Sequence, residues 1–257
     1  MLNETFYIDG IDARSFGIYL QKPIKFSEAV PVVKKQTIPG RNGDLIFETG
    51  SYQNRTAVAS CFCLQKDVEK TISAAGRFLM AKHGYRRLET SDDPDHFWLA
   101  RVENSPQIAQ RVRTLAPFDI SFDCKPQRFL KSGEEKMIFP HTQKHEEIQI
   151  YNNFGFPARP LIYAKWSEVT EHNYVDIIFY DASGNSMLDK NIRTFDMTVT
   201  DLYIDCDTHN AYNNDGNQNH NVVAYNFPAL DIGLNNITII GPESLESVEI
   251  MPRWWEL

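Results

Sequence analysis

Two cysteines spaced one residue apart, Cys61 and Cys63, are the first side chains of this sequence that could bind a metal. On a strand both thiols would point to the same face, and thiolates are good zinc ligands. Structural zinc needs about four ligands, however, and no second Cys pair or His pair stands near them in the sequence. With Cys124 and Cys206 as the remaining cysteines, we expect reduced, mostly buried thiols and no bound metal.

The stretch of residues 205–217 is rich in Asp and Asn oxygens that could bind calcium. It lacks the pattern of a calcium-binding loop, because Ala211 interrupts the alternation of Asp and Asn and no Glu closes the segment. A turn-rich loop between two strands explains these residues better. A calcium site stays open as the alternative, since calcium accepts varied geometry.

Carboxylate pairs could hydrolyse a glycosidic bond, and Asp92, Asp93 and Asp95 are the densest group. Their Asp-Asp-Pro-Asp context is more typical of a solvated turn. The chain has no Gly-x-Ser-x-Gly elbow, no Walker-type phosphate loop and no His-Glu-x-x-His helix. We therefore expect no catalytic residue, no cofactor and no enzyme activity, and a hydrolase acting on cell-wall material is the least favoured alternative.

Aromatic side chains offer a binding chemistry, because Trp166, Trp254, Trp255 and Tyr212 could stack on sugar rings. Packing in a core or an interface is the stronger interpretation. The adjacent pair Trp254 and Trp255 follows residues 248–251, which have the pattern of a strand. Leaving two tryptophans in water would be costly, so we expect this end of the chain to be tied into a core or a partner surface.

Composition and charge indicate two domains. The 257 residues are 42% hydrophobic and 12% aromatic, which is ample for a packed core. Residues 1–130 carry 18 basic and 15 acidic side chains, for a net charge of +3, whereas residues 131–257 carry 8 and 19, for −11. Neither half has the dense basic stripe that nucleic-acid binding needs. The chain has no apolar run long enough for a membrane span and no signal peptide, so we expect synthesis in the cytoplasm.

The first half has the pattern of strands interrupted by one helix. Residues 118–124 alternate between apolar and polar types, which predicts a half-buried antiparallel strand. Residues 57–64 are apolar or small on both faces, so we expect burial on both. Turns are predicted at Asp9-Gly10 and at Asn42-Gly43, the latter as a type I′ hairpin.

The helix is predicted over residues 66–83 and is expected to cover one face of the sheet. Asp67 is the expected N-cap and Gly84 the expected stop. Apolar residues recur at spacings of four, three and four along one helix face. These residues are Val68, Ile72, Ala75 and Leu79.

The second half is predicted to be a β-sandwich, with short strands separated by polar turns. The candidate strands cover residues 148–151, 161–165, 175–180, 199–205, 222–227, 236–240 and 248–251. The stretch between the halves contains Pro126, the segment Ser132-Gly133-Glu134-Glu135, and Pro140-His141, which is typical of a linker. We therefore expect a domain at residues 1–130, a linker at 131–146 and a second domain at 147–257.

Several segments, in this order, carry a resemblance to a known family. They are residues 6–12 and 16–18 as an opening hairpin, 38–44 and 50–55 as a turn and return strand, 122–126 as the end of a first domain, and 227–230, 233–235 and 252–255 as the end of a second. In order and spacing the chain resembles the distal tail proteins, often called Dit, of long-tailed, non-contractile bacteriophages.

The resemblance implies a mainly β fold with an N-terminal ring-forming domain and a C-terminal galectin-like sandwich. It also implies a hexameric ring at the tail tip of the virion, joining the tail tube protein to tip and receptor-binding proteins. DNA would only pass through the lumen, and no membrane contact is expected. A carbohydrate-binding tail adhesin that recognises host cell-wall polysaccharide is the alternative function.

The galectin-like fold does not by itself imply sugar binding. Galectin sites use a His-x-Asn-x-Arg strand, and the segment from His209 to Tyr212 lacks the arginine. We therefore expect the second domain to be a docking platform for other tail proteins. The expected contacts between subunits lie around a projecting hairpin, at Arg41, Asn42, Tyr52, Asn54 and Arg55.

Overall fold

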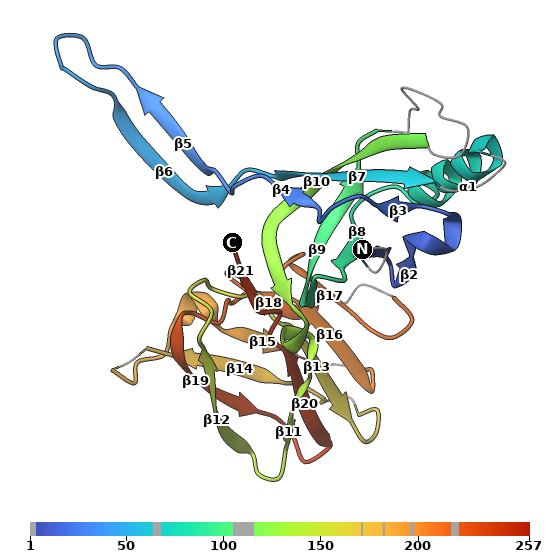
Figure 1. Ribbon diagram of the computed structural model, residues 1–257. Helices are drawn as coiled ribbons and strands as arrows, with labels where there is room; N and C mark the ends of the chain where they lie inside the picture. The colour runs from blue at the N-terminus through green and yellow to red at the C-terminus, as the bar shows by residue number, and fades with distance from the viewer. Residues whose placement is uncertain are drawn as a thin grey trace. The chain divides into compact units, whose positions relative to one another are not determined.

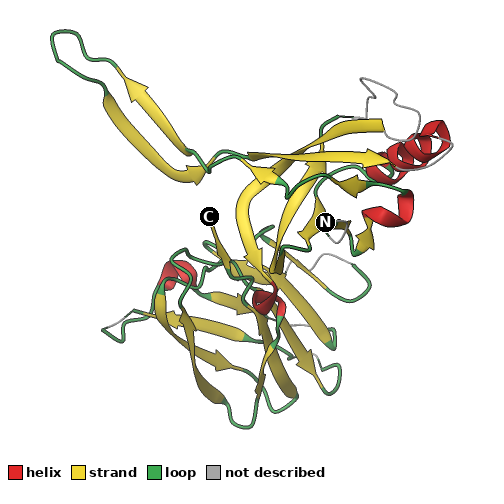
Figure 2. Ribbon diagram, viewed as in Figure 1, coloured by secondary structure: helices red, strands yellow, loops and turns green. Residues whose placement is uncertain are grey.

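The computed structural model describes residues 4–63, 68–104, 116–170, 172–181, 183–195, 198–216 and 221–257. Strands dominate these residues, and α1 (Val68–Met80) is their single α-helix. Figure 2 shows this mainly β character, which confirms the expected fold class. The chain divides into two compact units, unit 1 up to Arg128 together with Leu257, and unit 2 from Phe129 to Glu256.

Unit 1 contains one main antiparallel sheet and one separate hairpin. Its other elements are β1 (Phe6–Ile8), β2 (Ile11–Asp12), the 3-10 helix η1 (Ala13–Phe16), β3 (Tyr19–Leu20), β4 (Lys25–Phe26), β5 (Pro31–Gln36), β6 (Leu45–Tyr52), β7 (Arg55–Cys63), β8 (Arg86–Thr90), β9 (Asp93–Val102) and β10 (Ala116–Leu130). The main sheet follows the order β2-β1-β8-β9-β10-β7-β3, and β4 also pairs with β7 (Figure 1).

The core of unit 1 lies between this sheet and α1. Strands β7 and β10 pair in antiparallel register from Arg55 opposite Cys124 to Cys63 opposite Ala116. Ala75 and Leu79 of α1 are buried in the same cluster, as the helical stripe predicts. The side chains of Val68 and Ile72 and the expected cap Asp67 lie outside the described residues. The helix ends at Met80, three residues before the expected end at residue 83, so the expected stop at Gly84 is wrong; Gly84, with φ of +86°, lies in the connection to β8.

Strand β7 differs from the expectation of burial on both faces. Ala57, Ala59, Cys61 and Cys63 are fully buried, whereas the intervening side chains are only partly covered. Phe62 on that second face stacks on Tyr19 at 5.6 Å between ring centroids. The apolar composition of a strand does not show whether other parts of the same chain cover a given face or leave it partly exposed to solvent.

The two predicted turns have different outcomes. Asp9 and Gly10 have φ of +52° and +77° between the paired residues Ile8 and Ile11, which is the type I′ geometry. Asn42 does not have a positive φ, so the expected type I′ turn at Asn42-Gly43 is wrong. The chain uses a longer loop from residue 37 to 44 there, because β5 and β6 already stop pairing at Gln36 and Leu45.

Unit 2 is a sandwich of two five-stranded antiparallel sheets. Its elements are the 3-10 helix η2 (Lys131–Glu134), β11 (Met137–Pro140), β12 (His145–Asn152), β13 (Leu161–Trp166), β14 (Asp176–Tyr180), the 3-10 helix η3 (Leu188–Lys190), β15 (Ile192–Thr194), β16 (Asp201–Asp205), β17 (Asn210–Tyr212), β18 (Val222–Ala224), β19 (Gly233–Ile240), β20 (Leu245–Met251) and β21 (Trp255–Glu256). The sheets follow the orders β11-β20-β13-β16-β17 and β12-β19-β14-β15-β18.

The inner faces of these sheets share one apolar core, which includes Ile162, Ile177 and Leu202. Trp254 is buried in this core, and Trp255 stacks on Phe156 at 4.4 Å. The expectation that the tryptophan pair is tied into a core is therefore confirmed.

Residues 131–146, expected as a linker, form η2, β11 and the first residues of β12. Composition misled here because the Ser, Gly and Glu residues of η2 stand shortly before β11, a four-residue strand at a sheet edge that is too short to give a clear pattern. No helix among the described residues has the length and apolar character needed to span a bilayer.

Candidate functional site

The hairpin of β5 and β6 is the most exposed element of unit 1. Its two strands pair with each other and with no other described strand, and Figure 1 shows the hairpin reaching away from the main sheet. Ile46 and Phe47 on β6 are 54% and 49% exposed. An isolated two-stranded hairpin is marginally stable in water, and exposed apolar side chains of this kind are typical of surfaces that bind other proteins.

The tip of the hairpin carries two of the five expected contact residues. Arg41 and Asn42 are exposed there, in a loop that bends through Gly40 and Gly43 with φ of +78° and +81°. The Thr37 hydroxyl donates to the Asp44 carboxylate at 2.8 Å and ties the two sides of the loop together. The tip therefore presents one guanidinium and one amide to solvent.

The base of the hairpin carries the other three. Tyr52 is the last residue of β6 and pairs with Pro31. The Asn54 amide donates to the Tyr85 hydroxyl at 2.6 Å and to the Asp123 carboxylate at 2.8 Å. Arg55 donates to the Ser27 carbonyl at 2.7 Å. Eight residues of β6 separate tip from base by roughly 27 Å, so the structure does not bring all five together.

The contact residues expected from the sequence do not include the apolar middle of this hairpin. Ile46 and Phe47 stand between the tip and the base and are the side chains with most apolar surface to bury. The signal was present in the sequence as consecutive apolar residues 45–47 directly after a turn. Such a run is unusual in a strand that no core covers.

The four cysteines are free and buried. Burial raises the pKa of Cys61, Cys124 and Cys206 to about 12, so these thiols are poor metal ligands and poor nucleophiles. Among the described residues, no three His, Cys, Asp or Glu side chains are placed to hold one metal ion.

The oxygen-rich segment after β16 has a structural role. Both carboxylate oxygens of Asp205 accept from the Arg253 guanidinium, at 2.7 and 3.1 Å. Asp205 also accepts hydrogen bonds from the backbone N–H groups of Asp207 and Thr208. The segment is not one loop, because β17 starts at Asn210, and Asn217 lies outside the described residues.

The acidic turn before β9 also serves structure. Asp93 accepts from the Arg128 guanidinium at 2.7 Å and contacts the His96 ring nitrogen at 2.7 Å. Asp92 and Asp95 are exposed. Arg128 pairs with the carboxylate of Asp93, the first residue of β9. This carboxylate therefore anchors the start of the strand through a salt bridge, and the acidic residues do not form a hydrolytic pair.

The aromatic residues considered for sugar stacking are mostly unavailable. Trp166 is only 1% exposed, and Trp254 is buried beside it in the same core. Tyr212 stacks on Tyr203 at 5.3 Å between centroids, and Tyr203 in turn packs on Tyr163. Core packing, the stronger interpretation of these residues, is confirmed for Trp166 and Trp254, and sugar stacking on Trp166 is ruled out because its side chain lies in the sandwich core.

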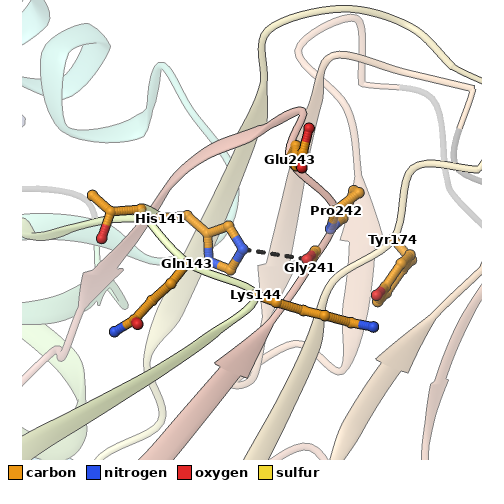
Figure 3. Close-up of a pocket in the computed structure, with 8 residues that line it drawn as sticks. His141, Gln143, Lys144, Tyr174, Gly241, Pro242 and Glu243 are labelled. Carbon is orange, nitrogen blue, oxygen red and sulfur yellow. Dashed lines mark hydrogen bonds between the residues drawn. The ribbon is translucent and has the colours of Figure 1, made fainter.

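A cavity of about 430 Å³ lies at one end of the sandwich, between the β11–β12 and β19–β20 loops (Figure 3). His141 contacts the Gly241 carbonyl at 3.3 Å, and Figure 3 shows the Lys144 side chain extending away from the imidazole, on the side where Tyr174 lies. No hydrogen bond or ion pair joins His141, Lys144 and Glu243 in the described structure. Acid–base or nucleophilic catalysis needs such a pair within reach, so the cavity has no catalytic constellation.

One family model matches most of unit 1. Residues 11–124 match the model of the phage tail protein RIFT-related domain. The matched segment begins at β2, ends within β10 and includes α1 and the β5–β6 hairpin.

Two solved structures resemble the whole chain, RIFT-related domain and sandwich together. The first is the Dit protein of phage SPP1, described as a paradigm of the hub adsorption apparatus in Gram-positive-infecting phages; the TM-score is 0.69 at 14% identity, over 96% of this chain and 97% of that one. The second belongs to the phage P2 baseplate in its activated conformation, with a TM-score of 0.50 at 10% identity over 96% of each chain. No curated protein sequence matches. The expected resemblance to distal tail proteins is confirmed at the level of fold.

Proposed function

We propose that this protein is a structural hub of a phage tail tip, assembled as a homohexameric ring and without catalytic activity. The exposed hairpin of β5 and β6 carries the proposal, because it has no core of its own and displays apolar side chains to solvent. The RIFT-related domain and the fold shared with the SPP1 Dit protein over 96% of the chain support a tail role.

A projecting hairpin favours a ring. In the proposed assembly a different surface of the next copy covers it, which makes the contact heterologous, and heterologous contacts close into rings when the rotation allows. Ile46 and Phe47 are consecutive residues of β6 and face opposite sides of it, so contacts on both faces of the hairpin would bury them, within an interface of roughly 2,000 Å² or more. In the ring, Arg41 and Asn42 contact the neighbour from the tip, while Tyr52, Asn54 and Arg55 form the contact at the base.

The ring joins the tail tube protein on one side to a tail-associated tip protein and receptor-binding proteins on the other. It acts in the virion after synthesis in the host cytoplasm. DNA passes through the lumen without sequence recognition, and the protein makes no membrane contact. Unit 2 serves as the docking platform for the tip proteins, consistent with its separate, acidic sandwich.

Light scattering coupled to size exclusion, with electron microscopy of the same fractions, tests the ring. We expect a mass equal to six chains and a six-fold annulus, alone or together with the tube and tip partners. Changing Phe47→Ser should shift the mass toward the monomer without lowering the melting temperature, since Phe47 belongs to no core.

Leu188→Ser is the matched control, because Leu188 is also an exposed apolar residue but lies in unit 2. It should leave the mass unchanged. A protein that stays monomeric beside both partners, or a Phe47→Ser variant that assembles normally, would contradict the proposal.

A further inference from the structure

The outer face of one sheet of the sandwich carries a shallow groove of about 400 Å³ across three neighbouring strands, β12, β19 and β14 (Figure 1). In the register of these strands Glu147 lies opposite Thr238, and Gln149 lies opposite Asn236. Asn236 is in turn opposite Tyr180 on the far side of β19. One row of polar groups, Gln149–Asn236–Tyr180, therefore crosses all three strands, and beside it Glu147 and Thr238 form a second row that ends at Ile178, over roughly 7 by 10 Å in all.

The hydrogen-bonding groups of this groove are largely unused. The Gln149 amide donates to the Asn236 side-chain oxygen at 3.0 Å, which leaves the Gln149 oxygen and the Asn236 amino group available. Within the described structure, the Glu147 carboxylate and the Thr238 and Tyr180 hydroxyls make no hydrogen bond. Alternating acceptors and donors on a rigid sheet are suited to hydroxyl groups, each of which donates once and accepts twice.

Aromatic and apolar side chains border the polar rows. Tyr180 closes one side of the groove. Tyr151, which is 61% exposed, and Leu234 pair with each other and extend the same face by one further row. An aromatic ring beside hydrogen-bonding groups suits a ligand with an apolar C–H face and polar edges, which is the character of a sugar ring.

Charge narrows the ligand class. The groove lining contains the carboxylates of Glu147 and Asp181 and no Lys, Arg or His. Asp181 accepts the backbone N–H groups of Ser183 and Asn185 at 2.9 and 2.8 Å, so its negative charge is held in place by the turn. Phosphate-bearing or carboxylate-bearing polymers would be repelled here.

We propose that the outer face of β12, β19 and β14 is a binding site for a neutral saccharide. The Gln149–Asn236 pair and Glu147 bind its hydroxyl groups, and Tyr180 contacts its C–H face. The site stands on unit 2 alone and is independent of whether the chain forms a ring.

Titration of the full-length protein with neutral di- and trisaccharides of glucose, galactose, rhamnose and N-acetylglucosamine, followed by saturation-transfer NMR, tests the site. We expect at least one of them to bind with a dissociation constant on the order of 1 mM. Gln149→Ala and Glu147→Ala should each weaken that binding about tenfold or more, because each removes hydrogen bonds to the ligand.

Gln143→Ala is the matched control, since Gln143 is an exposed glutamine of the same unit outside the groove. It should bind as the parent does, and all three variants should keep the parent's melting temperature and mass. Three outcomes would overturn the proposal. The first is the absence of saturation transfer from every neutral saccharide at about 10 mM, which is on the order of ten times the expected dissociation constant. The others are equal binding by the Gln149→Ala variant and a preference for poly(glycerol phosphate).

Discussion

At the scale of single residues, the contact between Asp205 and Arg253 connects the end of β16 to the segment that carries the tryptophan pair. The guanidinium meets the carboxylate through two hydrogen bonds, and Arg253 adopts a φ of +58° to reach it. Burial by itself raises the pKa of Asp205, but the hydrogen bonds and charge of Arg253 outweigh burial and hold that pKa below its ordinary value.

This lowered pKa predicts acid sensitivity. The stabilisation is present above the ordinary Asp pKa and is lost as pH falls through the lower value of the folded state. We expect Asp205→Asn to reduce the free energy of unfolding by about 2 kcal/mol at pH 7 and to flatten the fall in melting temperature between about pH 5 and pH 3. Glu243→Gln, at an exposed carboxylate, should leave the whole curve unchanged. Parallel curves for Asp205→Asn and the parent would contradict the assignment.

Gly133 makes a second prediction at this scale. A Cβ atom there would lie 2.3 Å from the Trp254 backbone nitrogen, and the Gly133 carbonyl accepts the Arg253 N–H at 2.7 Å. Gly133→Ala should therefore destabilise unit 2 by about 1–3 kcal/mol in denaturant titrations.

Gly76→Ala is the opposite case, because nothing lies within 4 Å of its Cβ and alanine favours a helix interior; it should stabilise α1 by up to about 1 kcal/mol. Equal effects of the two changes would refute the packing argument.

At the scale of elements, the pairing of β7 with β10 determines how the thiols behave. Alternate residues of β7 enter the core of unit 1, which places Cys61 and Cys63 on one fully buried face, and Cys124 of β10 is buried with them. In unit 2, Cys206 directly follows β16 and is equally buried.

These thiols should be unreactive in the folded protein. With a pKa of about 12 for Cys61, Cys124 and Cys206, very little thiolate exists at pH 8, and the core excludes the reagent. We expect Ellman's reagent to modify none of the cysteines in native buffer and all four in denaturant. Fast modification of even one thiol under native conditions would show that its strand opens.

At the scale of the whole molecule, the two units have separate cores. The core of unit 1 draws its buried residues from Phe6 to Cys124, and the core of unit 2 from Ile150 to Trp254. No buried residue of the described chain belongs to both clusters. Each unit therefore has an apolar core of its own that can unfold as a unit.

Calorimetry should resolve two unfolding transitions. Ile120→Ala, at a fully buried site in unit 1, should lower one transition by the equivalent of about 2–5 kcal/mol, and Leu202→Ala in unit 2 should lower the other. Each change should leave the remaining transition in place. A single transition that moves with both variants would mean that the units unfold together.

Much of this architecture could be predicted from local pattern. Alternation at residues 118–124, the helical stripe that includes Ala75 and Leu79, and the turn at Asp9-Gly10 all depend on neighbours in the chain, and the structure contains each of them. Short strands such as β15 and β17 were missed, because three residues give too little periodicity to detect.

Pattern and composition thus determined the mainly β class, the covering helix and the buried end of the chain, since these depend on the burial of apolar residues close in sequence. Tertiary structure alone decided which apolar residues remain in solvent. Ile46 and Phe47 look like core residues in the sequence, yet about half of each side chain is exposed in the fold, at 54% and 49%. The physical reason is that the side of a strand facing a core depends on strand pairing between distant segments, which one-dimensional spacing does not encode.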